Sequence, residues 1–340
     1  MATVGMRQMT RTTRTWRHGA AAAALVTATV TASLMAGCTS GDRSSDDGRG
    51  QTHGRSQEPG HSESPNPTSA GPVIAVKIDN VPAARPQTGL EAADIVYAEQ
   101  VEGGLSRLMA IYATRLPEAV GPVRSARESD LELLGQFAEP TLAFSGAQRK
   151  LLPLIDRAPL TAEPPESAAS GAYYRVTDKA APHNLYLRPR KLVGTAPGAD
   201  ALTTGFRYGT APGGGTAEKS RTVRFPSARF TFTWSADRHG WLVSMDGTPT
   251  VAGDGERIAA ATVVVQYVKV RESRFHDVLG NNSPYTQSVG SGRAQVLRDG
   301  RAFDVQWRRA ATTDGTDFTT ADGSPVNFAT GQVWVLFVKA

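Results

Sequence analysis

A single cysteine, Cys38, stands among the 340 residues of this chain. One thiol cannot close an intramolecular disulfide, and it cannot form a zinc site built from several cysteines. The folded part must therefore be stabilised by the burial of apolar side chains. The roughly 270 residues that read as folded are enough to do this in one or two domains.

The residues before Cys38 have the order of a secretion signal. Four arginines and no acidic residue precede an apolar, small-residue run over 19–35, and Ala36-Gly37 then leads to the cysteine. This arrangement resembles the lipobox of bacterial lipoproteins, although Met35 stands where leucine is usual. The resemblance implies a lipoprotein signal peptide over 1–37 and a lipid, palmitate included, on Cys38. The alternative is an ordinary signal peptide followed by an unpaired cysteine.

A lipidated Cys38 predicts a protein anchored to the extracytoplasmic face of the cell membrane. Two or three acyl chains hold a protein stably at a bilayer, because each buried methylene contributes about 0.8 kcal/mol. The formal charge of +5 falls to about +1 without the leader, so the sequence gives no reason to expect nucleic-acid binding. Residues 38–71 are almost free of apolar side chains and are predicted to be a disordered tether.

Strand and helix patterns alternate over 72–206, which predicts an α/β domain. Apolar runs at 73–78, 94–101, 107–113 and 141–144 are typical of buried strands. The pattern over 124–138 predicts a helix, and 151–155 a shorter one. This first half is therefore expected to be α/β or mixed α+β.

The composition changes after Phe206. Alternating strand patterns follow at 229–234, 240–244, 262–270, 294–297, 303–307 and 333–338. Asp-Gly pairs separate several of them, and this dipeptide favours two-residue hairpin turns. Residues 222–340 are thus predicted to form a mainly antiparallel β domain that packs against the first.

Several segments resemble the YerB-like bacterial lipoproteins, a family defined by a paired N- and C-terminal domain of unknown function. The most specific are GPVRSAR at 121–127 and APHNLY at 181–186, with others at 76–80, 84–89, 93–97, 101–104, 290–294, 307–309 and 331–334. The resemblance implies an envelope lipoprotein with two adjoining domains. It also implies a partner in peptidoglycan assembly, and it supplies no established reaction.

Two arginines in the first of these segments suggest an anion site. Arg124 and Arg127 lie three residues apart at the predicted start of a helix, which places them on one helix face. Cations there oppose the helix dipole, so an external carboxylate or phosphate would explain their placement. Internal pairing with Glu99, Glu102 or Glu128 remains the alternative.

A wall-polysaccharide hydrolase that uses Glu99 or Glu102 with His183 is the alternative function. Such enzymes use two carboxyl groups roughly 5–9.5 Å apart. Glu99 and Glu102 are three apart in a predicted strand, which places them on opposite faces. The sequence shows no Ser-x-x-Lys or Gly-x-Ser-x-Gly run, no histidine pair with metal-ligand spacing and no cofactor motif.

We therefore expect a binding protein rather than an enzyme, with an envelope protein, a wall glycan or another envelope ligand as its partner, no cofactor and no metal. The site is predicted to be a concave surface of the first domain, where charged groups either pair or face a ligand. Its expected members are Asp79, Asn80, Arg85, Glu99, Glu102, Arg107, Arg124, Arg127, His183 and Asn184.

Overall fold

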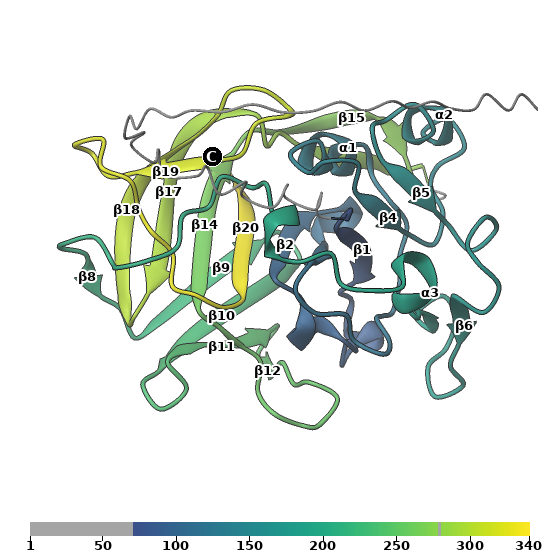
Figure 1. Cartoon of the computed structure of the whole chain (residues 1–340), viewed down its shortest axis with the longest axis horizontal. Helices are drawn as coiled ribbons and strands as arrows, with labels where there is room; N and C mark the ends of the chain where they lie inside the picture. The colour runs from purple at the N-terminus through teal and green to yellow at the C-terminus, as the bar shows by residue number, and fades with distance from the viewer. Residues whose placement is uncertain (1–70, 278–279) are drawn as a thin grey trace, which may run out of the picture. The chain divides into compact units, whose positions relative to one another are not determined.

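The computed structural model describes residues 71–277 and 280–340, and β-strands dominate it (Figure 1). The first half contributes strands to a mixed parallel and antiparallel sheet, and the second half is mainly antiparallel. The predicted fold class is confirmed. The predicted leader, Cys38 and the tether up to residue 70 lie outside the described residues.

The largest sheet has eleven strands and takes them from both halves of the chain. Their order is β19 (Asp317–Thr319), β18 (Arg301–Arg309), β17 (Gly290–Arg298), β14 (Thr262–Val268), β20 (Val333–Lys339), β2 (Ile95–Gln100), β3 (Ser106–Tyr112), β1 (Ile74–Asp79), β4 (Thr141–Ala143) and β5 (Thr161–Glu163), and β8 (Thr216–Ala217) pairs with β18.

The two halves meet inside this sheet, where β2 and β20 pair in parallel. Ile95 lies opposite Val333 and Ala98 lies opposite Leu336. Residues 72–206 and 222–340 therefore share backbone hydrogen bonds as well as packed side chains. That each range folds as a separate domain stays a prediction.

Alternate residues of the central strands face opposite sides of the large sheet, as the two-residue period of a strand requires. On one side, Val96 of β2 and Trp334 of β20 join one apolar cluster. On the other side, Tyr97 and Val335 join a second cluster. Both sides are buried, which explains why these strands are apolar at consecutive positions.

A second sheet covers the side that carries Trp334. It consists of β12 (Thr248–Pro249), β11 (Gly240–Met245), β10 (Ala228–Ser235) and β9 (Ser220–Phe225), and β13 (Ala259–Ala260) pairs with β11. The rings of Phe230 and Phe232 lie 6.2 and 5.9 Å from the Trp334 ring, centroid to centroid. These aromatic contacts fix the two sheets face to face.

The opposite side of the large sheet receives α1 (Glu128–Leu134), whose Leu133 and Leu134 join the cluster of Tyr97. Two short helices, α2 (Leu152–Ile155) and α3 (Arg190–Val193), also belong to the first half (Figure 1). The remaining strands form two hairpins, β6 (Tyr173–Arg175) with β7 (Leu185–Leu187) and β15 (Val270–His276) with β16 (Asn282–Thr286).

The predicted helix over 124–138 is wrong at its start. Residues 123–126 are extended because their backbone bonds to three different segments: the N–H of Val123 donates to Leu185, that of Arg124 to Lys77, and that of Ala126 to Gly146. The helix begins only at Glu128. Arg124 and Arg127 consequently do not share a helix face.

Two predicted Asp-Gly turns have the backbone that this dipeptide favours. Asp246 and Gly247 have φ of 52° and 91°, and Asp299 and Gly300 have φ of 50° and 69°. Positive φ at both central positions matches the twist of the strands that the turn joins. These turns connect β11 with β12 and β17 with β18.

Candidate functional site

A cavity of about 600 Å³ opens where the first half meets the β15–β16 hairpin. The first half supplies the end of β1, the 3₁₀ turn Glu102–Gly104, the start of β3 and the extended segment before α1. The hairpin supplies Phe275, His276 and Ser283 among others. Five predicted site residues line the cavity: Asp79, Glu102, Arg107, Arg124 and Arg127.

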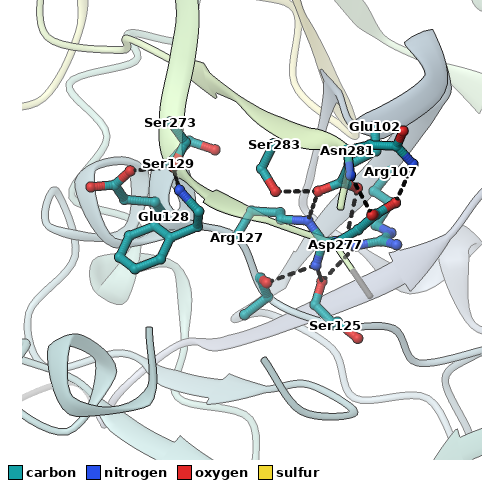
Figure 2. Close-up of polar contacts among 12 residues, drawn as sticks. Glu102, Arg107, Ser125, Arg127, Glu128, Ser129, Ser273, Asp277, Asn281 and Ser283 are labelled. Carbon is teal, nitrogen blue, oxygen red and sulfur yellow. Dashed lines mark hydrogen bonds and ion pairs between the residues drawn. The ribbon is translucent and has the colours of Figure 1, made fainter. Parts of the chain in front are cut away.

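Arg127 and Glu102 form a bidentate ion pair in the wall of this cavity (Figure 2). Arg127 Nε lies 2.6 Å from Glu102 Oε1, and Nη2 lies 2.7 Å from Oε2. The Ser283 hydroxyl also donates to Glu102. Burial opposes ionisation of this carboxyl, but Arg127 and Ser283 outweigh it and hold the pKa of Glu102 below its ordinary value. Glu102 is therefore an ionised carboxylate whose charge is already neutralised.

Asp79 is shared by two partners from distant parts of the chain. Arg124 Nε lies 2.9 Å from Asp79 Oδ2, an ion pair without hydrogen-bond alignment. His183 Nδ1 lies 2.8 Å from the same oxygen. The Asp79 side chain is almost fully buried. Its interactions with Arg124 and His183 therefore offset the free-energy cost of removing the carboxylate from water.

Arg107 lines the same cavity with a weaker set of partners. The residue is buried, and its Nη1 donates a hydrogen bond to the Ser125 carbonyl at 3.1 Å (Figure 2). The ion pairs of Asp79 and Glu102 are formed by Arg124 and Arg127 and do not include Arg107. Burial and the nearby Arg127 cation lower the pKa of Arg107 to about 10 despite the attraction of Glu102.

Glu99 does not line the cavity, although it was predicted to join the site. Its carboxylate accepts hydrogen bonds from Lys77 and from Ser129, the latter at 2.8 Å, and Lys77 also reaches Asp130 at 2.7 Å. Burial, with Asp130 adding to it and Lys77 opposing it, raises the pKa of Glu99 to about 7. Glu99 belongs to a buried network that holds β1 and β2 against α1.

Asn80 and Arg85 are not part of the cavity wall and make structural contacts. Asn80 Nδ2 donates to Ser106 Oγ at 2.9 Å, and Arg85 Nε donates to Asn80 Oδ1 at 3.2 Å. Arg85 Nη2 reaches Asp246 in the second half at 2.8 Å. Arg85 thus ties the first half to the turn after β11.

Asn184 holds the β6–β7 hairpin. Its Oδ1 accepts a hydrogen bond from Arg175 at 2.7 Å, and its Nδ2 donates to the Val176 carbonyl at 3.2 Å. Neither Asn184 nor His183 is part of the cavity wall, and His183 touches the site only through Asp79.

Sequence reasoning missed two kinds of residue. Lys77 is a charged residue inside an apolar strand run, a signal that a buried ion pair was needed. Phe275 and Ser283 carried no such signal, because only the docking of a hairpin from the second half brings them to the wall.

Within residues 71–277 and 280–340, no group of histidine, cysteine, aspartate and glutamate is arranged to hold a metal ion. Within the same ranges, no helix is long and apolar enough to cross a membrane. The polar groups of the cavity wall include the guanidinium groups of Arg107, Arg124 and Arg127 and the hydroxyl of Ser283.

Two segments of the chain match the two parts of one family. Residues 60–202 match "Protein of unknown function (DUF3048) N-terminal domain", and residues 221–335 match the C-terminal domain of the same description. Both matched ranges contribute residues to the cavity wall, the second through the β15–β16 hairpin.

A protein of Bacillus subtilis (strain 168) named "Putative lipoprotein YerB" is 24% identical over 282 residues, which cover 78% of this chain and 80% of that protein. The crystal structure of YerB protein from Bacillus subtilis has a similar fold, with a TM-score of 0.65 at 21% identity. That match covers 79% of this chain and 91% of the solved one.

Proposed function

This chain belongs to the DUF3048 family, and from that premise we propose that it is a lipoprotein of the cell envelope that binds an envelope ligand or a protein partner in its arginine-lined cavity. The proposal has two parts, an anchor at Cys38 and a binding site between the two halves. Each part rests on a different observation.

The anchor is supported by the leader and by the relative. Cys38 follows Ala36 and Gly37 after a basic and then apolar leader, which is the order of a lipoprotein signal. The Bacillus subtilis relative carries "lipoprotein" in its name. We therefore place the folded part on the extracytoplasmic face of the membrane, attached by lipid.

The binding site is supported by one observation, the cavity of about 600 Å³ with four arginines in its wall, of which Arg149 is exposed. This volume lies within the range of small-ligand sites. The wall gathers the buried Arg107 of β3 and the partly buried Arg124 and Arg127 of the segment before α1. This arrangement is costly for the fold, because guanidinium groups lose hydration there. Binding of an anionic ligand or partner by these arginines would explain why the fold keeps them in the wall despite their lost hydration. A role in peptidoglycan assembly stays a prediction from the family resemblance.

The contacts of the candidate catalytic groups favour binding over hydrolysis. The Glu99 carboxylate is held by Lys77 and Ser129 inside the core, and Glu102 is neutralised by Arg127. The His183 ring bonds to Asp79. A glycosidase needs one carboxyl free to give its proton and another free to attack or to activate water, and these partners oppose both roles.

Site-specific photo-crosslinking in living cells tests the binding site. A photoreactive amino acid replaces Arg149, an exposed residue of the cavity wall, in the full-length protein. The control replaces Arg308, which is exposed on β18. We expect a discrete adduct, protein or glycan, from position 149 and none from position 308. Equal labelling at both positions, or none at either, would contradict the proposal.

A further inference from the structure

We propose that Arg107 is the ligand-binding group of the cavity and that it takes an anionic oxygen group, a carboxylate or a phosphate, attached to an apolar moiety. The inference rests on the proposed function and adds the chemistry of the ligand. It starts from an imbalance among the charged groups of the cavity wall.

The carboxylates of the wall have partners of their own. Glu102 is bound bidentately by Arg127, and Asp79 by Arg124 and His183. A third, Glu128, accepts a hydrogen bond from Ser273 and lies 3.5 Å from Arg274.

Asp277 accepts two hydrogen bonds from Asn281, at 2.8 and 2.9 Å. Arg107 takes part in none of the ion pairs of Asp79, Glu102 and Glu128, and its guanidinium donates to the Ser125 carbonyl.

Arg107 has donors to spare for an external anion. A guanidinium offers five N–H groups in a planar fork, and the Ser125 carbonyl takes one of them. The residue is only 9% exposed, so bulk water screens its charge poorly. Two parallel N–H groups match the two oxygens of a carboxylate or two oxygens of a phosphate.

The lowered pKa of Arg107 agrees with this assignment. Burial and the Arg127 cation work against its charge, and only the more distant carboxylates favour it. An anion bound at Arg107 would stabilise the charged form of its guanidinium, because an opposite charge within about 4–6 Å favours the ionised state. The site is thus prepared for a negative group.

The remainder of the wall specifies the rest of the ligand. Val101, Leu105, Leu151 and Phe275 line the same cavity. These side chains offer a surface for an apolar or ring-bearing moiety, since burial of apolar area favours binding. A ligand that joins an anionic oxygen group to such a moiety would satisfy both parts of the wall.

Three probes with one ring test the chemistry: benzoate, phenyl phosphate and uncharged benzyl alcohol. Each is titrated into the full-length lipidated protein in detergent, with binding followed by calorimetry. We expect one or both anions to bind and benzyl alcohol to bind at least about tenfold more weakly. Preference between benzoate and phenyl phosphate identifies the anion as a carboxylate or a phosphate.

Arg107→Gln is the matched variant and Arg308→Gln its control, because Arg308 is exposed on β18 and is not part of the cavity wall. The first should weaken anion binding at least about tenfold, and the second should leave it nearly unchanged. Arg107→Gln should fold, since the ion pairs of Asp79 and Glu102 do not include Arg107, and its thermal unfolding checks this. Arg107→Lys, which keeps the charge but not the fork, should fall between wild type and Arg107→Gln.

Three results would overturn the inference. They are equal binding of anions by wild type and Arg107→Gln, equal binding of benzyl alcohol and the anions, and no anion binding up to the solubility of the probes. In each case the crosslink at position 149 is an independent readout. Its persistence would leave the proposed function standing with a different ligand chemistry, whereas its loss would remove both.

Discussion

Arg309, near the end of the chain, donates a hydrogen bond from Nη2 to the backbone carbonyl of Glu132 in α1, at 2.9 Å. The same guanidinium reaches Ser288 Oγ at 2.9 Å and the Asp314 carbonyl at 2.9 Å. The carboxylate of Glu132 in turn accepts from the N–H groups of Ser288 and Val289. A helix of the first half is therefore held at its end by strands of the second.

Arg309→Met should destabilise the fold by about 3 kcal/mol, because several buried carbonyls lose their donor at once. The control is Arg308→Met, one residue away on the exposed side of β18. Urea unfolding of both variants measures the difference. Similar midpoints for the two variants would show that the Arg309 contacts contribute little.

Arg127→Ala should cost about 2 kcal/mol of stability, because it leaves the Glu102 carboxylate buried without its ion pair. The double variant Arg127→Ala with Glu102→Gln should recover most of that loss, since the remaining group is neutral. Thermal unfolding at neutral pH compares the single and double variants. No recovery in the double variant would mean that Arg127 stabilises the site by packing rather than by charge.

The stability of the protein should carry a pH dependence from Glu99. Its pKa is about 7 in the folded chain and about 4.5 when unperturbed, so the folded state binds the proton more tightly than the unfolded state. This contribution is fully present below about pH 4.5 and is lost as the pH rises towards 7.

Glu99→Gln should remove this contribution and flatten the stability profile between pH 4.5 and 7. Glu166→Gln, at an exposed position, is the control and should leave the profile of the wild type. The measurement is the urea midpoint across the pH range. Identical profiles for wild type and Glu99→Gln would refute the assignment.

Gly121→Ala should destabilise the fold by about 1–3 kcal/mol. A Cβ built at Gly121 would lie 2.6 Å from Cδ1 of the Tyr186 ring, and Gly121 begins the segment that carries Arg124 and Arg127. Gly213→Ala is the control, because a Cβ there meets nothing within 4 Å. Equal melting temperatures for the two variants would show that the Tyr186 ring moves aside at little cost.

Cys38→Ala should release the protein from the membrane fraction or leave its leader uncleaved, because the thiol is the predicted site of lipid attachment. Phase partitioning in detergent and the mass of the mature N-terminus report the two outcomes. Cys38→Ala protein that is cut at the same bond and still partitions with detergent would rule out the lipid anchor.

The central strands of the large sheet could be predicted because their sequence is apolar at consecutive positions. Val76, Val96 and Val335 are buried and sit in short apolar runs rich in β-branched residues, which are typical of a strand buried on both faces. The helix expected from Arg124 onwards failed for a different reason. At its start, the backbone N–H groups donate hydrogen bonds to the carbonyls of Lys77, Leu185 and Gly146 instead of joining a helix. The local spacing of apolar residues carries no information about such distant partners.

The site was predictable where charge had to be neutralised. Glu102, Arg107 and Arg127 were expected together, and the cavity wall contains all three. Glu99 was expected there as well, but the two-residue period of β2 directs it towards Ser129 instead. The part of the wall built by Phe275 and Ser283 depends on the docking of a hairpin from the second half, and Ser283 bonds to Glu102 across 181 residues of sequence. No local sequence pattern predicts such a contact.

The parallel pairing of β2 with β20 sets an order in which the sheet can be completed. β20 lies in the middle of the sheet, between β14 and β2, yet it follows every other described strand along the chain. Synthesis proceeds from the N-terminus, so the gap between the two halves stays open until residues 333–339 have emerged. Until then β2 and β14 each present an edge of unpaired backbone N–H and C=O groups. Such edges favour pairing with other chains, so the incomplete protein needs protection from aggregation until β20 has been added.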